Sequence, residues 1–517
     1  MSSPLLDEDP DIGLITTDVH VVSNREPYRH EYGGRPDEAA TDGMGVDGAG
    51  ADDRRDGDVV VDRPVGGLTA GLDPVMRRLG GTWIAWGDGE ADFAVSDDDN
   101  RVAVPPEDPQ YTLQRIQLSN EEVDGYYRGY ANRTLWPLCH AQMGHVEFRA
   151  DDWETYRTVN RKFAAVTADS VDDSSTVWFQ DYHFALAPRY VRAESDALLM
   201  QFWHVPWPAA EVFRTAPHRE ALLKGLLAND LLGFHVPWYC SNFLECVEEF
   251  LEEAIVDWAE GRVHYGDRPT RVESFPLAVE AAEIRELAEA GAADDASGRF
   301  RADHGIDPDR RLVLGVDRLD YTKGIPERLA ALEHLWETRP AFRGAFTYVQ
   351  KGRESRGGID AYRELQATID DAVARVNDRF GTDGWQPVVA TTDHLPSEQL
   401  YGLYRDADVA LLTPLRDGMN LVAKEYVAAQ ADDDAALVLS EFAGAYRQLG
   451  EDAIGVNPRN TPETAAAIAR GLEMDEGERR VRMRRLRDQV AGETVDGWIE
   501  SVMDAAAAVA GRRRRAR

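Results

Sequence analysis

Apolar runs and helical spacings alternate along the second half of the chain. Short apolar runs bounded by turn-forming residues predict buried parallel strands at 312–317, 345–350, 387–391, 409–413 and 435–440. Apolar positions three and four residues apart predict helices near 326–337, 359–379 and 397–405, and from 421 onward. Because strands that alternate with helices build a parallel sheet covered on both faces, this half is predicted to be a doubly wound α/β domain.

The first half of the chain repeats this alternation less regularly. Apolar runs predict strands at 19–24, 81–87, 177–183 and 200–208. We therefore expect a Rossmann-like N-terminal domain over 1–275, a Rossmann-like C-terminal domain over 276–490, and a final helix with a disordered basic tail over 491–517. The segment 28–62 is rich in Gly and Asp and poor in apolar residues, so it is predicted to be a flexible acidic surface loop.

The segment Ala410–Gln430 carries the first candidate chemistry. A predicted strand and a predicted helix flank its tight polar loop, Arg416–Asn420. A helix start offers unpaired N–H groups and the positive end of the helix dipole, so the loop is predicted to seat a diphosphate. Glu425 lies about one helical turn further on, within reach of an attached ribose, and Asp417 lies at the carboxyl end of the strand, where open α/β sheets bind ligands. Taken alone, an ordinary strand–turn–helix explains the segment equally well.

A second segment, Leu312–Gly324, favours the ligand interpretation. Its predicted strand is followed by Arg318 and Lys323, a planar fork and a point charge that suit a sugar-nucleotide diphosphate. Lysine is scarce in this chain, so a generic surface position would more often be Arg. Lys323 is therefore predicted to have a specific task.

Further candidates follow other predicted strands. Asp181 and His204 each come at a strand end, and the paired glycines Gly66 and Gly67 open a helix, where they would let a phosphate or sugar approach the backbone. A single Asp or His at a strand end is often only a structural hydrogen-bonding group, but several together indicate a ligand crevice. The aromatic-rich stretch 126–140 is more typical of a core than of a binding site.

Charge limits the possible partners. The 517 residues include 93 acidic and 57 basic side chains, a formal charge of −36. This balance argues against nucleic acid and against an anionic membrane as partners. Strong acidity with Arg favoured over Lys resembles proteins adapted to a high-salt cytoplasm, and it predicts poor folding at low salt, where self-repulsion is unscreened.

The cysteines and the amino terminus indicate a compartment. Cys139, Cys240 and Cys246 form no CxxC and no metal-ligand spacing, which is typical of a reducing environment. No apolar run approaches the ~20 residues of a membrane span, and the acidic start of the chain lacks the form of a signal peptide. We expect a cytoplasmic protein.

Together, these residues resemble the trehalose-6-phosphate synthase family, retaining glycosyltransferases of the GT-B fold in glycosyltransferase family 20. The resemblance extends from about Val21 to about Pro458 and rests on long motifs: VSNR, GGL, YYRGYANRTLWP, DYH, HVPWP, GVDRLDYTKGIPERL, SRG, LRDGMNLVAKEYVAAQ and LSEFAGA. It implies two Rossmann-like domains that face each other across a catalytic cleft. The implied reaction transfers glucose from UDP-glucose to glucose 6-phosphate, giving α,α-trehalose 6-phosphate and UDP. No cofactor and no metal would be needed, because Arg318 and Lys323 supply the positive charge.

The resemblance also assigns the donor side. Arg318 and Lys323 would hold the donor diphosphate, Asp417 the glucose hydroxyls and Glu425 the ribose, and His204 would touch the donor sugar. Of these, Arg318, Lys323, His204 and Asp417 would act in catalysis. The remaining donor-binding residues would be Gly66, Gly67, Leu395, Gly418, Met419, Asn420, Leu421, Val422, Ala423 and Lys424.

On the acceptor side, the resemblance places Arg25 and Arg356 at the acceptor phosphate, with Tyr127 beside them. Trp86, Trp136 and Asp181 would hold the acceptor sugar. One departure is Gln180, which stands where the family commonly has His before Asp-Tyr-His. It removes none of the predicted charges.

Two alternatives remain. The chain could be a related retaining transferase with another acceptor, such as a glucosylglycerol-phosphate synthase that uses glycerol 3-phosphate, or with ADP- or GDP-glucose as donor. It could also be a catalytically silent sugar-phosphate-binding regulator, although a silent copy has no need to keep Arg318, Lys323, Asp417 and Glu425. We further expect a possible homo-oligomer and a separate trehalose-6-phosphate phosphatase, since the chain ends too soon after the synthase region for an appended phosphatase domain.

Overall fold

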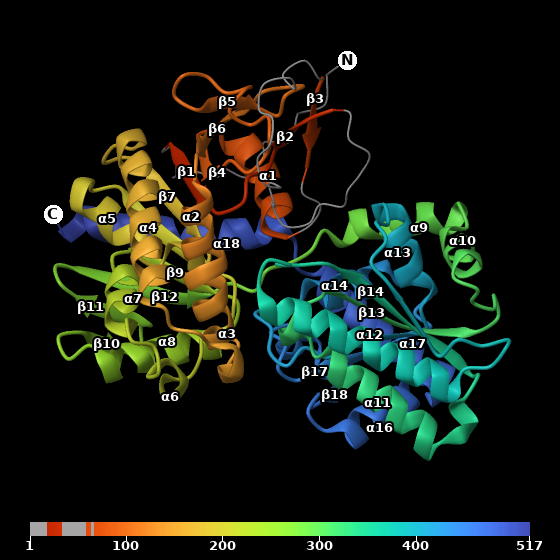
Figure 1. Cartoon of the computed structure of the whole chain (residues 1–517). Coiled ribbons are helices and arrows are strands. Elements are labelled where there is room, and N and C mark those ends of the chain that lie inside the picture. The colour runs from red at the N-terminus through yellow and green to blue at the C-terminus, as the bar shows by residue number, and fades with distance from the viewer. Residues whose placement is uncertain (1–17, 34–57, 64–66, 517) are drawn as a thin grey trace, which may run out of the picture.

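Two sheet-containing domains lie side by side in the computed structural model (Figure 1), which describes residues 18–33, 58–63 and 67–516. The strands of the first domain are β1 (Val19–Ser23), β2 (Arg29–Tyr32), β3 (Val59–Asp62), β4 (Thr82–Trp86), β5 (Arg101–Val104), β6 (Tyr111–Ile116), β7 (Thr176–Gln180), β8 (Leu198–Trp203), β9 (Leu231–Phe234), β10 (Ile255–Asp257), β11 (Arg262–Tyr265) and β12 (Arg268–Ser274). Its helices are α1 (Gly67–Leu79), α2 (Asn120–Glu122), η1 (Val123–Leu135), α3 (Trp136–Cys139), η2 (Met143–His145), α4 (Ala150–Ser170), η3 (Tyr182–Phe184), α5 (Ala187–Glu194), α6 (Ala210–Phe213), α7 (Arg219–Leu226) and α8 (Pro237–Phe250).

The second domain alternates strand and helix more strictly. Its strands are β13 (Arg311–Arg318), β14 (Phe346–Arg353), β15 (Val388–Thr391), β16 (Val409–Leu412), β17 (Ala436–Ser440) and β18 (Ile454–Val456). Its helices are α9 (Ala281–Ala293), α10 (Ala296–Asp303), η4 (Tyr321–Lys323), α11 (Ile325–Thr338), η5 (Pro340–Phe342), α12 (Asp360–Phe380), α13 (Ser397–Asp406), α14 (Leu421–Ala429), α15 (Tyr446–Leu449), α16 (Thr461–Glu473) and α17 (Glu476–Ala491).

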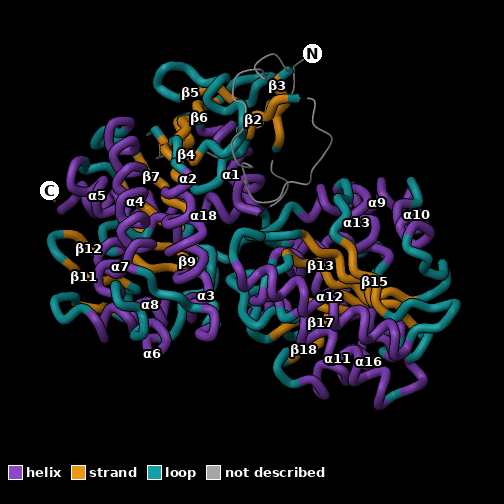
Figure 2. Tube along the Cα trace, viewed as in Figure 1, coloured by secondary structure: helices purple, strands orange, loops and turns teal. Residues whose placement is uncertain are grey.

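Both domains have the doubly wound topology that the sequence predicts. The second sheet runs β15-β14-β13-β16-β17-β18 and is parallel throughout, the order of a dinucleotide-binding fold. The first runs β10-β11-β12-β9-β8-β7-β1-β4-β6-β5, with antiparallel pairs only at its two ends. Figure 2 shows the strands of each domain enclosed by helices. The predicted α/β fold class is confirmed, and the strand predicted over 312–317 lies within β13.

The prediction of a flexible loop over 28–62 is only partly correct. Its two ends form β2 and β3, which pair as an antiparallel ribbon with Arg29 opposite Asp62. Val59, Val60 and Val61 are exposed on this ribbon, so its apolar residues gave no sign of a buried strand. Residues 34–57 of the predicted loop lie outside the described part of the chain.

The last helix, α18 (Val495–Ala516), returns from the second domain to the first, where it crosses behind β8 and β9 (Figure 1). Trp498 packs against Trp178 and Phe202 of the first sheet, with ring centroids 5.6 and 5.2 Å apart. The expectation of a disordered tail from Gly511 is therefore wrong, because the helix continues through Ala516.

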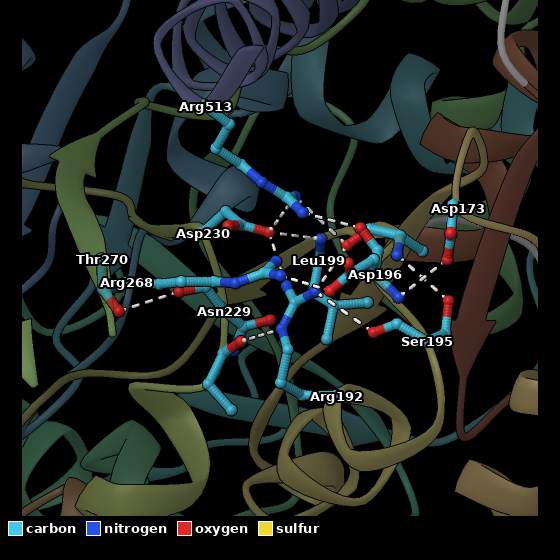
Figure 3. Close-up of polar contacts among 12 residues, drawn as sticks. Asp173, Arg192, Ser195, Asp196, Leu199, Asn229, Asp230, Arg268, Thr270 and Arg513 are labelled. Carbon is cyan, nitrogen blue, oxygen red and sulfur yellow. Dashed lines mark hydrogen bonds and ion pairs between the residues drawn. The ribbon is translucent and has the colours of Figure 1, made fainter. Parts of the chain in front are cut away.

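Ion pairs hold the end of α18 against the first domain (Figure 3). Asp230, at the start of β9, is 2 % exposed and accepts hydrogen bonds from Arg192 at 2.6 Å and Arg513 at 3.0 Å. Arg513 also donates to the carbonyl oxygen of Asp196 at 2.7 Å, and Arg268 pairs with the Asp196 carboxylate. A buried carboxylate needs such partners, and the basic tail supplies one of them.

Candidate active site

The carboxyl ends of the central strands of the two sheets meet where the domains face each other. Asp181 follows β7 and His204 follows β8 in the first domain, while β13 ends at Arg318 in the second. Parallel sheets bind ligands at these ends, because loops and helix N-termini gather there. Asp181, His204 and Arg318 thus lie at the ends of strands that face this seam.

On the donor side, the loop between β16 and α14 is ordered by its own side chains. Asn420 has φ +75°, and its side chain accepts a hydrogen bond from the Ala423 N–H at 3.1 Å. The Asp417 carboxylate accepts from Asn420 at 3.1 Å and pairs with Lys323 Nζ at 2.5 Å. Burial alone would raise the pKa of Asp417, but Lys323 and these hydrogen bonds hold it below its ordinary value, so it is a carboxylate.

The first turn of α14 retains free donors, as the sequence predicts. Asn420 caps Ala423, whereas among the described residues no acceptor contacts the N–H groups of Leu421 and Val422. These two groups and the helix dipole favour an anion beside the loop. Lys424 does not contribute its charge: its Nζ donates to the Leu277 carbonyl at 2.8 Å and pairs with Glu493 at 3.2 Å, on the inner side of the helix.

Glu425 lies half-buried on the second turn of α14. Burial raises the pKa of its carboxyl to about 7, against a smaller opposing effect of a hydrogen bond from the Tyr404 hydroxyl. Its charge therefore changes near neutral pH.

Within the described part of the chain, Arg318 has no carboxylate within hydrogen-bond distance, unlike Lys323, Arg25 and Arg356. It is exposed, and among the described residues it makes no hydrogen bond or ion pair; its guanidinium lies 5.4 Å from the centroid of the Trp136 ring. A guanidinium held over an aromatic face and free of carboxylates is available to a diphosphate.

Trp136 joins the two domains. It lies at the start of α3 in the first domain, and the Arg356 guanidinium of the second domain stacks 3.9 Å from its ring centroid. Its Nε1 approaches the Asp320 carboxylate at 3.4 Å. The predicted acceptor residues Trp136 and Arg356 are therefore in direct contact, although they come from different domains.

A buried network that the sequence did not predict holds Arg356. Asp320, which is fully buried, accepts from Arg356 at 3.2 Å and from the Tyr362 hydroxyl at 3.1 Å. Arg356 also donates to the Tyr182 hydroxyl at 3.3 Å, across the domain seam. Burial raises the pKa of Asp320, but Arg356 and Arg318 more than offset this and hold it below its ordinary value. The one available signal was the position of Tyr182 inside the DYH motif.

The predicted phosphate-binding Arg25 contacts Tyr127, the residue that the resemblance places beside it. It donates to the Asp88 carboxylate at 2.8 Å and to the Tyr127 hydroxyl at 3.0 Å, and its guanidinium stacks 5.3 Å from the Tyr127 ring centroid. Trp86 packs against the same tyrosine, with ring centroids 5.9 Å apart. Asp88, which sets the orientation of Arg25, was not predicted.

Asp181 and Gly418 bring the donor and acceptor sides together. Asp181 has φ +68°, a strained value for a side chain with a Cβ, and its carboxylate accepts from the N–H groups of Tyr182 at 2.9 Å and His204 at 3.1 Å. Burial raises its pKa to about 7. Gly418 lies directly against His204: a Cβ on Gly418 would stand 2.0 Å from the His204 carbonyl oxygen. Only a glycine permits this approach.

Gly66, Gly67 and Leu395 complete the predicted donor residues. Gly67 is the first residue of α1, and Gly66 lies outside the described residues. Leu395, in the loop before α13, is half-buried and packs on the core of the second domain.

Two facing doubly wound domains with the candidate ligand-binding residues at the seam are typical of glycosyltransferases of the GT-B fold. The chain belongs to glycosyltransferase family 20, whose model matches residues 49–508.

Proteins of known activity resemble the chain over most of its length. The trehalose-6-phosphate synthase of Mycolicibacterium vanbaalenii is 38% identical over 461 residues, which cover 88% of this chain and 93% of that protein. The trehalose-6-phosphate synthase of Mycolicibacterium gilvum is 39% identical over 459 residues, 87% of this chain and 90% of that protein.

Solved structures extend the similarity to the fold. The Escherichia coli protein bound with UDP-2-fluoro glucose has a TM-score of 0.80 at 30% identity and covers 95% of this chain and 99% of its own. The UDP-forming synthase of Burkholderia xenovorans in complex with glucose-6-phosphate has a TM-score of 0.80 at 30% identity. It covers 94% of this chain and 99% of its own.

Proposed function

We propose that the protein is a retaining glucosyltransferase that transfers glucose from UDP-glucose to glucose 6-phosphate and releases α,α-trehalose 6-phosphate and UDP. The observation that carries this proposal is the contact of Gly418 with His204, which sets the donor loop of the second domain against the strand ends of the first. Arg318 and Lys323 flank this contact on the donor side, and Arg25 and Tyr127 lie on the acceptor side. Two substrates bound there would meet at the seam.

The proposed mechanism relies on charge and orientation. Arg318, Lys323 and the free N–H groups of Leu421 and Val422 would stabilise the negative charge that builds on the departing UDP, which is usually the largest catalytic contribution. Asp417 would hold the glucose hydroxyls. The acceptor would attack from the same face as the leaving group, so we assign no nucleophile. Closure of the two domains would orient both sugars and exclude water.

No metal is needed in this proposal, because the two cations neutralise the diphosphate. The described residues contain one trio of carboxylates close enough to share an ion, Glu26, Asp88 and Asp92. Arg115 pairs with Glu26 at 2.8 Å and with Asp92 at 3.1 Å, and Arg25 pairs with Asp88, so arginines already neutralise the trio. The trio supports Arg25 through Asp88, and it lies apart from the residues proposed to hold the donor diphosphate.

We further propose a cytoplasmic protein adapted to high salt, whose product is processed by a separate phosphatase to an osmolyte. The three cysteines are free, which suits a reducing compartment. The charge of −36 suits a high-salt solution, where self-repulsion is screened. None of the helices within the described ranges combines the length and the apolar character of a membrane span.

Product analysis tests the proposal. The protein is incubated in high-KCl buffer with UDP-, ADP- or GDP-glucose, each with glucose 6-phosphate, and the new linkage is identified by NMR. An α,α-1,1-linked disaccharide phosphate formed fastest from UDP-glucose is the expected result. Nucleotide release without this product would indicate another acceptor, such as glycerol 3-phosphate. If a folded sample showed no turnover, the protein would instead be interpreted as a sugar-phosphate-binding regulator.

A further inference from the structure

Gln180 and His204 lie side by side at the ends of two neighbouring strands. Gln180 ends β7 and is paired in register with Phe202 of β8, so His204, two residues further on, projects from the same face of the sheet. The Gln180 Oε1 atom lies 3.0 Å from His204 Nε2. Gln180 is 1 % exposed and His204 is half-buried, so this hydrogen bond is partly buried.

The backbone of His204 is fixed from both sides. Its N–H donates to the Asp181 carboxylate at 3.1 Å, and its carbonyl oxygen lies under Gly418 of the second domain. The ring packs between Phe202, at 4.6 Å between centroids, and His235, at 5.2 Å. The backbone of His204 therefore stands between the donor loop and Asp181, and its ring packs against Phe202 and His235.

The imidazole is neutral. Burial lowers the pKa of His204 well below its ordinary value, and His235 lowers it further. A neutral imidazole carries one N–H and one lone pair, and the partner of one nitrogen decides which nitrogen has the proton. The amide oxygen of Gln180 can only accept, so its contact places the proton on Nε2. Among the described residues, Nδ1 has no hydrogen-bond partner.

We propose that Gln180 is a positioning residue that holds His204 in the Nε2–H tautomer, which leaves the Nδ1 lone pair to accept a hydrogen bond from a hydroxyl of the donor sugar. The identity of the ligand rests on the proposed function, whereas the tautomer does not. The Gln180 Nε2 group is buried without a partner among the described residues, so the contact with the His204 ring is the one hydrogen bond that the Gln180 side chain makes there. A carboxylate at this position would add a charge beside the ring. An apolar side chain would offer no acceptor, so neither ring nitrogen of His204 would be favoured as the protonated one.

The tautomer can be measured directly in the ligand-free protein. The chain, which has 12 histidines, is labelled with ¹⁵N only in their imidazole rings, and the His204 signals are identified by their loss in His204→Asn. Two-bond ¹⁵N–¹H correlations then distinguish the Nε2–H form, the Nδ1–H form and the imidazolium. The Nε2–H form is expected. A predominant Nδ1–H form would mean that the Gln180 amide has the opposite orientation, and it would overturn the proposal, as would an imidazolium.

Gln180→Met tests the consequence, because methionine has a similar length and no amide. We expect both tautomers in this variant and a rise of roughly 3- to 10-fold in the KM for UDP-glucose, the effect of one neutral hydrogen bond. The KM for glucose 6-phosphate is expected to stay unchanged.

The matched control is Gln201→Met. Gln201 is also buried, lies on β8 and donates to the Asp181 carbonyl oxygen at 3.0 Å, but it does not contact the His204 ring. This variant is expected to keep the Nε2–H form. A single Nε2–H tautomer and an unchanged donor KM in Gln180→Met would refute the role of Gln180. If the protein formed no transfer product, the proposed function would fall, and the tautomer measurement would still decide whether Gln180 sets the ring.

Discussion

The donor side and the acceptor side are assembled over very different lengths of chain. Asp417 and Asn420 are three residues apart and order one loop, and Lys323 reaches that loop from the neighbouring strand end of the same domain. On the acceptor side, Trp136 and Asp320 are 184 residues apart, and Arg356 contacts Tyr182 over 174 residues. The loop around Asp417 therefore depends on local turn and helix geometry, whereas the contacts of Trp136 and Tyr182 with Asp320 and Arg356 exist only when the two domains are docked.

The two sides also differ in how their cations are held. Arg318 has no acidic partner among the described residues, while Arg356 is surrounded by Asp320, Tyr362 and Tyr182. A free cation can respond fully to a charge that appears during the reaction, whereas a buried, hydrogen-bonded cation is preorganised before the substrate arrives. If this contrast is correct, changes on the donor side will affect turnover, and changes on the acceptor side will affect both stability and acceptor binding.

The largest effect is expected for Arg318→Ala. Loss of this unpaired cation removes stabilisation from the departing diphosphate, so kcat is expected to fall by about 10²- to 10³-fold. The melting temperature is expected to change little, because Arg318 is exposed and contacts only the Trp136 ring. Initial rates and thermal unfolding check both expectations.

Arg353→Ala is the matched control for Arg318. Arg353 ends the neighbouring strand β14 in register with Arg318 and is equally exposed. Its loss is expected to leave kcat within about twofold, as for an ordinary surface substitution. Equal losses in both variants would show that general positive charge, rather than Arg318 itself, supports the donor diphosphate.

Gly418→Ala is expected to be the next most damaging change. The added methyl would collide with the His204 carbonyl oxygen, a backbone atom that cannot rotate away. A displacement of about 1 Å at the seam would cost about 10²-fold in kcat/KM, because both substrates would lose their alignment.

The control for Gly418 is Gly384→Ala, where an added Cβ meets no atom within 4 Å. That variant should keep its activity and fold. Wild-type turnover in Gly418→Ala would mean that the two domains do not approach each other as closely in the working enzyme.

The same contrast between local and long-range contacts explains which parts of the fold could be predicted from the sequence. Between β13 and β17 the strands and long helices of the second domain were predicted, since each shows its own periodicity: the prediction of 326–337 corresponds to α11 and that of 397–405 to α13. Outside that span, α9, α10, α15, β18, α16 and α17 were not predicted. Helix η1 was missed because 10 of its 13 residues are buried, which leaves no polar face to reveal a helical period. Gly129 within it has no room for a Cβ, which would lie 2.6 Å from the Asp152 side chain of α4.

Among the site residues, local chemistry was predictable and long-range partners were not. The loop around Asp417 could be predicted from a strand, a polar turn and a helix start in direct succession. The roles of Asp320 and Asp88 depend on which arginine the fold brings to them, and no spacing in the sequence encodes that pairing. Lys424 shows the converse: its place in the motif predicted a donor contact, but the fold turns its charge toward Glu493.

Asp320→Asn tests the acceptor side. The change keeps the shape of the side chain but removes the charge that compensates the buried Arg356, so we expect a loss of about 3 kcal/mol in the free energy of unfolding. Because Arg356 and Trp136 would lose their common partner, the KM for glucose 6-phosphate is expected to rise about tenfold, with a smaller change in the KM for UDP-glucose. Chemical denaturation and separate titration of the two substrates measure these effects.

Asp230→Asn provides the comparison for Asp320. Asp230 is also a buried carboxylate held by arginines, Arg192 and Arg513, but it lies at the end of α18 (Figure 3). We expect a similar loss of stability without a selective change in the acceptor KM. A selective acceptor defect in both variants would mean that the Asp320 network acts through domain docking in general.

The smallest effect is expected for Glu425→Gln. Because burial raises the pKa of this carboxyl to about 7 from its ordinary value of 4.5, the native protein binds its proton more tightly than the unfolded chain does. Its contribution to stability is therefore fully present below about pH 4.5 and is lost as the pH rises to about 7. Donor binding has the opposite dependence, since the carboxylate accepts hydrogen bonds from the ribose better than the acid: affinity for UDP-glucose should increase as the pH rises through 7.

In the Gln variant, both dependences are expected to disappear. At pH 8, the KM for UDP-glucose should be roughly 3- to 10-fold higher than in the wild type, while the unfolding free energy should be higher because a buried charge is gone. Titration of donor KM and of urea unfolding between pH 5 and pH 8 measures the two trends in one sample series. A wild-type donor KM, or a pH step that persists in the variant, would remove Glu425 from the ribose site. Glu425 then would be only a buried acid that destabilises α14.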